Sequence, residues 1–85
     1  MKIEAEKAVW GNGATINVLG ADVGILFQNV TGVNVSGGAN GFVSLRFNRA
    51  DGVLGSITLP LLEAVALVAK LESLGIDTHG ELDVS

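Results

Sequence analysis

Polar and apolar positions alternate along most of the first sixty residues, with short turn-forming segments between the alternating runs. A period of two is typical of a strand with one buried face, so the pattern predicts five to six strands. Each connection is too short for a crossover, which favours antiparallel pairing of neighbouring strands. The predicted strands cover 2–10, 14–19, 23–30, 33–36, 42–48 and 53–58.

The strand at 23–30 is apolar on both faces, because Phe27 and Val30 fall on opposite sides of a regular strand. A strand of this kind is either covered on both sides within the chain or buried against a partner. Glycines and Asn12 at 11–13, and Gly52 at the end of 50–52, suit the tight turns of two hairpins.

One helix is predicted, over 61–74. Pro60 suits its first turn, with Thr58 or Leu59 as the cap, and Gly75 is expected to end it in the left-handed conformation.

Eighty-five residues allow one domain. The sequence therefore predicts an α+β fold, an antiparallel β-meander of five to six strands packed on one C-terminal α-helix. The domain is assigned to 1–75, and 76–85 is assigned as an acidic C-terminal tail that contains no basic residue.

The predicted helix is apolar nearly all round. At 100° per residue its broad apolar face is expected to pack on the sheet. Leu62 widens this face, whereas Leu67 and Leu74 fall near Glu63 and Lys70 on the side expected to face solvent. The residues of the broad face are Leu61, Ala64, Val65, Val68 and Leu71.

A helix that is apolar on both sides needs cover on both, and one small sheet covers only one. A homo-oligomer, with a dimer favoured, supplies the second cover, and Leu62, Leu67 and Leu74 are then predicted interface residues. The alternative is that Ile76 and the tail fold back over the helix.

Trp10 is the only tryptophan, and it ends a strand whose predicted wet face carries Glu4 and Glu6. It is a candidate anchor for a protein partner, and the alternative is a lid over the core.

The composition is also unusually apolar for so small a domain. Of the residues, 48% are hydrophobic and 16% are charged, although a domain of this size buries only about 60% of its surface on folding. The absence of cysteine excludes disulfides and a cysteine-ligated zinc site. No segment approaches the ~20 apolar residues of a membrane span, and the N-terminal residues mix both charges, unlike a signal peptide. A cytoplasmic protein is expected.

The chain has few candidate catalytic residues. It has one histidine, and its serines lack the Gly-x-Ser-x-Gly context of a nucleophile. The sequence predicts neither an enzyme nor a cofactor. Asp77, His79, Glu81 and Asp83 alternate, and an extended tail would place all four on one side, where they could hold a divalent cation. A metal-assisted enzyme is one alternative, and a solvated tail is the expectation.

Phe42, Ser44, Arg46 and Asn48 share one predicted strand face, and Arg49 follows. A ring for base stacking beside a cation makes single-stranded nucleic-acid binding a second alternative, with Phe42, Arg46 and Arg49 as its residues. The net charge of −4 disfavours binding to duplex nucleic acid.

The order of a meander followed by a helix, over 14–74, resembles the dimeric single-stranded-DNA-binding fold of transcriptional coactivators. The resemblance implies that a single strand of DNA would bind across the β-sheet. Of the basic residues that such families carry on their sheets, this chain keeps Arg46 and Arg49.

The favoured function is therefore a small non-enzymatic protein-interaction module that binds an unidentified protein and forms a homo-oligomer. Small size and missing active-site chemistry suggest an accessory or inhibitor protein of the phage type.

Overall fold

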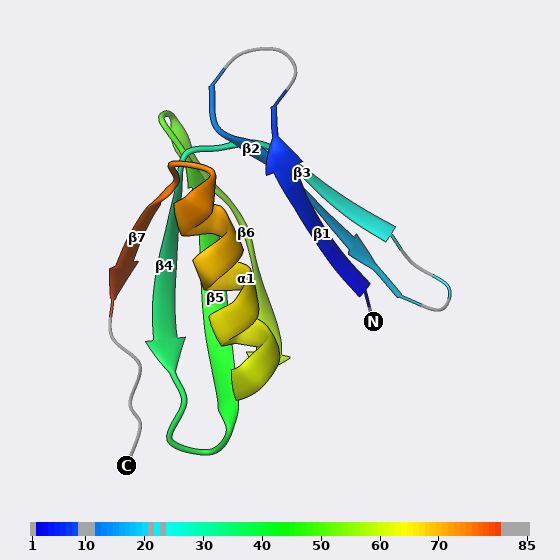
Figure 1. Ribbon diagram of the computed structural model, residues 1–85, viewed down its shortest axis with the longest axis vertical. Coiled ribbons are helices and arrows are strands. Elements are labelled where there is room, and N and C mark those ends of the chain that lie inside the picture. Colours follow the sequence, from blue (N-terminus) through cyan, green and yellow to red (C-terminus); the bar gives the residue numbers. More distant parts are fainter. Residues whose placement is uncertain (1, 9–11, 21, 23, 81–85) are drawn as a thin grey trace.

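Seven strands and one helix make up the computed structural model, which describes residues 2–8, 12–20, 22 and 24–80. The helix follows the sixth strand and precedes the seventh (Figure 1). In chain order the elements are β1 (Lys2–Lys7), β2 (Ala14–Leu19), β3 (Gly24–Val30), β4 (Gly32–Gly37), β5 (Phe42–Arg49), β6 (Gly52–Pro60), α1 (Leu61–Ser73) and β7 (Asp77–Gly80).

The strands form two sheets. The N-terminal sheet has the order β1-β2-β3 and is antiparallel throughout. The C-terminal sheet has the order β6-β5-β4-β7, in which β4, β5 and β6 are antiparallel and β7 runs parallel to β4. In Figure 1, α1 lies across one face of the C-terminal sheet and the N-terminal sheet slants away at the side. The predicted α+β fold with a meander and one helix is confirmed, and the division into two sheets and the strand β7 were not foreseen.

An irregularity in β3 lets the strand bury residues that the simple alternation separates. Ala14 pairs with Val30 but Ile16 pairs with Phe27, so β3 has two residues between these pairs where β2 has one, and the one extra residue forms a bulge. Asn29 there has φ of 58°, a conformation that asparagine tolerates better than most residues. As a result Phe27 and Val30 are both buried, and the prediction that they lie on opposite faces is wrong.

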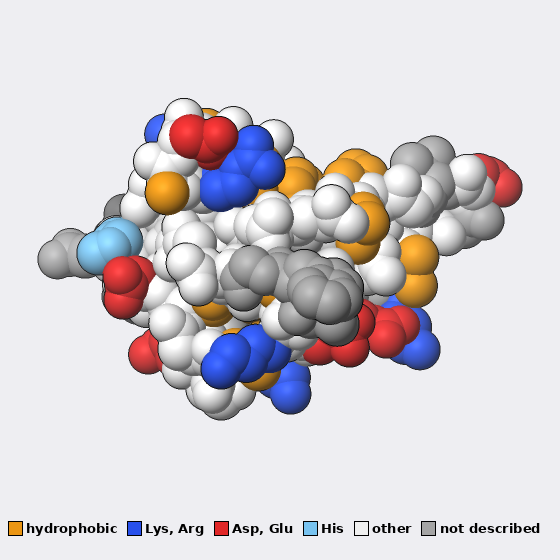
Figure 2. Space-filling view, turned by 90° about the horizontal axis from the view of Figure 1, so that it is seen from above, with side chains coloured by type: hydrophobic (Ala, Val, Ile, Leu, Met, Phe, Trp, Pro, Cys, Tyr) orange, Lys and Arg blue, Asp and Glu red, His pale blue; other side chains and the backbone are white. Residues whose placement is uncertain are grey.

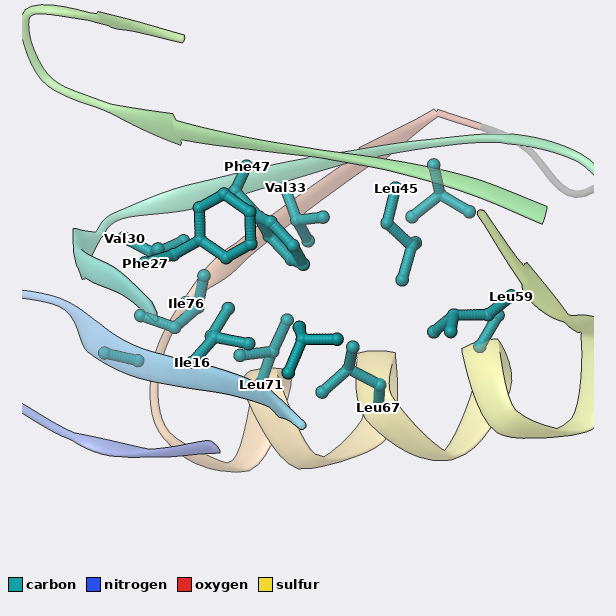
Figure 3. Close-up of a cluster of buried hydrophobic side chains, with 14 of the residues drawn as sticks. Ile16, Phe27, Val30, Val33, Leu45, Phe47, Leu59, Leu67, Leu71 and Ile76 are labelled. Atoms are coloured by element: carbon teal, nitrogen blue, oxygen red, sulfur yellow. The ribbon is translucent and has the colours of Figure 1, made fainter. Parts of the chain in front are cut away.

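The core lies between the C-terminal sheet and a second layer made by α1 and the N-terminal sheet (Figure 3). The Phe27 and Phe47 rings, one from each sheet, have their centroids 4.8 Å apart at an interplanar angle of 50°. Phe27 also lies on Gly55 of β6, where a Cβ atom would stand only 2.8 Å from Cε1 of the ring. A glycine in β6 therefore makes room for the aromatic contact that joins the two sheets.

The end of α1 directs the chain back into the core. Gly75 has φ of 85° and donates its N–H to the Glu72 carbonyl, and Ile76 donates to the Leu71 carbonyl. This pair of bonds is the Schellman motif, and its usual hydrophobic contact is present because Ile76 and Leu71 are both buried. The prediction that Gly75 ends the helix is confirmed.

The segment after this turn forms β7 beside β4. Gly80 ends the strand with φ of 98°, and any Cβ there would collide with the Val35 carbonyl. Glycine is thus required for the close approach of β7 to β4.

The start of α1 differs from its prediction. Pro60 occupies the N-cap position without a side-chain hydrogen bond, so the expected caps Thr58 and Leu59 are wrong. Leu61 instead donates its N–H to the Gly41 carbonyl at 2.9 Å, and the loop before β5 satisfies one of the free donors of the helix.

Candidate functional site

The helix α1 carries two apolar stripes on opposite sides. One stripe is buried and consists of Ala64, Leu67 and Leu71. The side chains of Leu67 and Leu71 project towards the C-terminal sheet (Figure 3). The other is exposed, and the side chain of Leu62 in it is 84% accessible, the most of any large hydrophobic residue in the described part of the chain. The exposed stripe consists of Leu62, Val65, Ala66 and Ala69, whose spacings of three and four residues place them on one side of a helix.

The helix is turned about its axis relative to the prediction. Leu67 is only 7% accessible and Leu74 is partly buried against the core, so the prediction that both face solvent is wrong. Val65, expected to pack on the sheet, is 45% accessible. The physical reason is a second neighbour: Ile3 of β1 lies beside α1 on the flank that holds Leu67. Leu62 is the predicted interface residue of the helix that remains at the surface.

Two grooves run along the helix. The first, of about 350 Å³, lies between α1 and β1 and is lined by Ile3 and Ala5 on one wall and by Glu63 and Lys70 on the other. The second, of about 320 Å³, lies between α1 and β7, with Val65 among its lining residues. α1 therefore forms a ridge between the two grooves, and the exposed stripe is the crest of this ridge. None of the described strands covers the side of α1 that faces away from the C-terminal sheet (Figure 1).

One acidic and one basic side chain lie along the same side of this ridge. Glu63 and Lys70 lie on the β1 flank, seven residues or about 10 Å apart along the axis. Within the described residues the ion pairs are Lys2–Glu4 and Arg49–Asp51, so Glu63 and Lys70 have no ionic partner there.

The opposite surface of the C-terminal sheet is polar. Its central row crosses all four strands, as the register of neighbouring residues shows: Ser56, Arg46, Asn34 and His79. Phe42 is 52% accessible, and the burial of Val43, Leu45 and Phe47 agrees with the predicted common outer face of Phe42 and Arg46.

Arg49 is held in the β5–β6 hairpin. Its Nε donates to Oδ1 of Asp51 at 2.8 Å, and this hydrogen bond and the guanidinium charge lower the pKa of the Asp51 carboxyl below its ordinary value. Arg49 therefore already has an anionic partner, which weakens the predicted role of this residue in binding nucleic acid. Figure 2, the view from above, shows scattered groups of basic and acidic side chains among the described residues and no continuous basic track on that face.

Only two of the four predicted metal-ligating residues near the C-terminus lie in the described part of the chain. Asp77 and His79 belong to β7 and are exposed, whereas Glu81 and Asp83 lie outside the described residues, as does Trp10. Among residues 2–8, 12–20, 22 and 24–80, no group of three or more His, Cys, Asp or Glu side chains is placed to hold a metal ion.

No protein-family model, curated protein or solved structure matches this chain. No helix in the described part of the chain has the length and apolar character that crossing a membrane requires.

Proposed function

We propose that this chain is a non-enzymatic protein-interaction module that docks a protein partner on the exposed stripe of α1. The observation that carries this proposal is the exposure of Leu62 and Val65, 84% and 45%, on a helix whose other side is packed in the core. Single exposed leucines are common on protein surfaces. A stripe of apolar side chains at helical spacing, raised between two grooves, is instead typical of a docking surface.

Leu62 offers the largest apolar contribution to binding at this surface. Burying one leucine or valine side chain contributes about 1.5–3 kcal/mol, and Leu62 starts almost fully exposed. The chain needs no catalytic group for this role, which is that of an accessory or inhibitor protein acting in the cytoplasm.

Site-specific photocrosslinking in the producing cells tests the proposal. A benzophenone-bearing phenylalanine replaces Leu62 in the exposed stripe, and the matched control replaces Ser56, which is also exposed but lies on the opposite surface. We expect a defined adduct from position 62 and little from position 56. Equal yields at both positions, or no adduct at position 62, would contradict the proposal.

Binding of single-stranded nucleic acid is the second candidate function, favoured by the accessible Phe42 ring and by Arg46 on the same outer face. Fluorescence anisotropy with a labelled oligothymidine tests it. Binding that weakens with salt and is lost in Arg46→Glu with Phe42→Ala would establish this candidate. Under the docking proposal the oligonucleotide does not bind.

A further inference from the structure

We infer that the partner on the exposed stripe is a second copy of this chain, whose α1 lies antiparallel to the first across a two-fold axis. This inference rests on the proposed function, because it names the occupant of the same surface. It is carried by the size of the residues along the stripe and by the arrangement of charge beside it.

The residues along the crest permit close approach of two helices. Ala66 and Ala69 are exposed at the middle of α1, and side chains as small as alanine let helix axes come within about 8 Å. With 3.6 residues per turn, an antiparallel pair can set Ala66 against Ala69 of the partner subunit. The same register brings Leu62 over the last turn of the partner's helix, and both ends of the contact are then covered by a leucine.

An antiparallel pair matches both charges of the β1 flank. A two-fold axis in the interface, at right angles to the helices, reverses one helix but keeps the same flank on the same side. The flank with Glu63 and Lys70 therefore meets its own copy in reverse order, and Glu63 faces Lys70 of the partner subunit. Symmetry repeats the contact, so one interface contains two complementary ion pairs.

A parallel pair matches only one of the two charges on the β1 flank. A two-fold axis along the helices brings the Glu63 flank against the opposite flank, which carries Val65 and Glu72 next to β7. Lys70 then lies about two residues along the axis from Glu72 of the partner subunit, whereas Glu63 faces an apolar side chain and has no base across the interface. The antiparallel arrangement is the one in which the crest and its β1 flank are both self-complementary.

Charge reversal in the purified protein tests the arrangement, with sedimentation measured from micromolar to millimolar concentration. We expect the wild type to form a dimer of twice its 8.7 kDa. Glu63→Lys alone and Lys70→Glu alone each oppose like charges twice and weaken the dimer by about tenfold. Mixing the two variants restores both ion pairs, and a heterodimer forms with an affinity within about threefold of the wild type.

Glu72→Lys is the matched control, because it changes the net charge as Glu63→Lys does but lies on the flank next to β7. We expect it to leave the affinity within about twofold of the wild type. Thermal melts of all variants confirm that they are folded before association is compared.

The outcomes separate this inference from the proposed function. A wild type that stays monomeric, together with adducts at position 62 in cells, overturns the second copy and leaves docking of a foreign protein in place. A wild-type dimer that neither reversal weakens, or a mixture that fails to recover, overturns the antiparallel arrangement. Loss of the adduct at position 62 overturns the docking surface itself.

Discussion

The two sides of α1 differ little in composition but greatly in what surrounds them. Leu71 is fully buried, and Leu62, two and a half turns earlier on the other side, is 84% accessible. The buried stripe faces the C-terminal sheet and the exposed stripe faces open solvent in the described chain. Composition alone therefore does not identify the core side of this helix, and the neighbouring elements do.

Truncation of one leucine on each side is the most direct test of this difference. Leu71→Ala removes a fully buried side chain and leaves a cavity, so we expect a loss of about 2–5 kcal/mol in the free energy of unfolding. Leu62→Ala should change it by less than about 0.5 kcal/mol. Urea denaturation of both variants, below the concentration at which the wild type associates, measures the two losses. Similar losses would show that the exposed stripe is also packed within one chain.

Loosening the C-terminal turn of α1 has a smaller expected effect on the buried side. A Cβ at Gly75 would meet nothing within 4 Å, so Gly75→Ala costs only the strain of a positive φ, about 1 kcal/mol. Gly75→Asn is the control and should lose less, because asparagine tolerates this conformation. Denaturation curves check both. A loss as large as that of Leu71→Ala would mean that the turn does more than end the helix.

A charged pair in the β5–β6 hairpin, outside both stripes, provides the baseline for the charge reversals. The pKa of Asp51 is lowered in the folded state by Arg49, so the pair adds stability above the ordinary pKa of the carboxyl and loses it as the pH falls through the folded pKa. We expect Arg49→Gln to raise the pKa of Asp51, as an NMR titration would record. Because the Asp51 carboxyl is at the surface and its ion pair is screened by solvent, the free energy of unfolding should change little. A changed affinity between copies would place the interface at this hairpin instead.

The sequence predicted the elements more reliably than their neighbours. The strand pattern, the helix and its end at Gly75 follow from local preferences, and they are present in the structure. The orientation of α1 depends on β1, which lies some sixty residues away in sequence and covers the flank of Leu67. An apolar pattern that runs nearly all round a helix contains no signal for this rotation.

Two further features could not be read from periodicity. The irregularity at Asn29 moves Val30 to the side of Phe27, and no single residue marks it in advance. β7 consists of Asp77, Thr78, His79 and Gly80 and has no apolar alternation, so its pairing with β4 comes from the place to which α1 and Gly75 bring the chain. For the candidate site, Leu62 was predicted, whereas the importance of Ala66 and Ala69 depends on knowing which side is covered.

The parallel pairing of β7 with β4 also has a consequence for the order in which the protein is made. Gly32 pairs with Asp77, 45 positions later, and the ladder ends where Val35 meets Gly80. During synthesis from the N-terminus, the β4 edge stays unpaired until β7 has been translated and has left the ribosome. Completion of the sheet thus waits for the synthesis of both α1 and β7, and a nascent chain halted in α1 presents a bare strand edge to its surroundings.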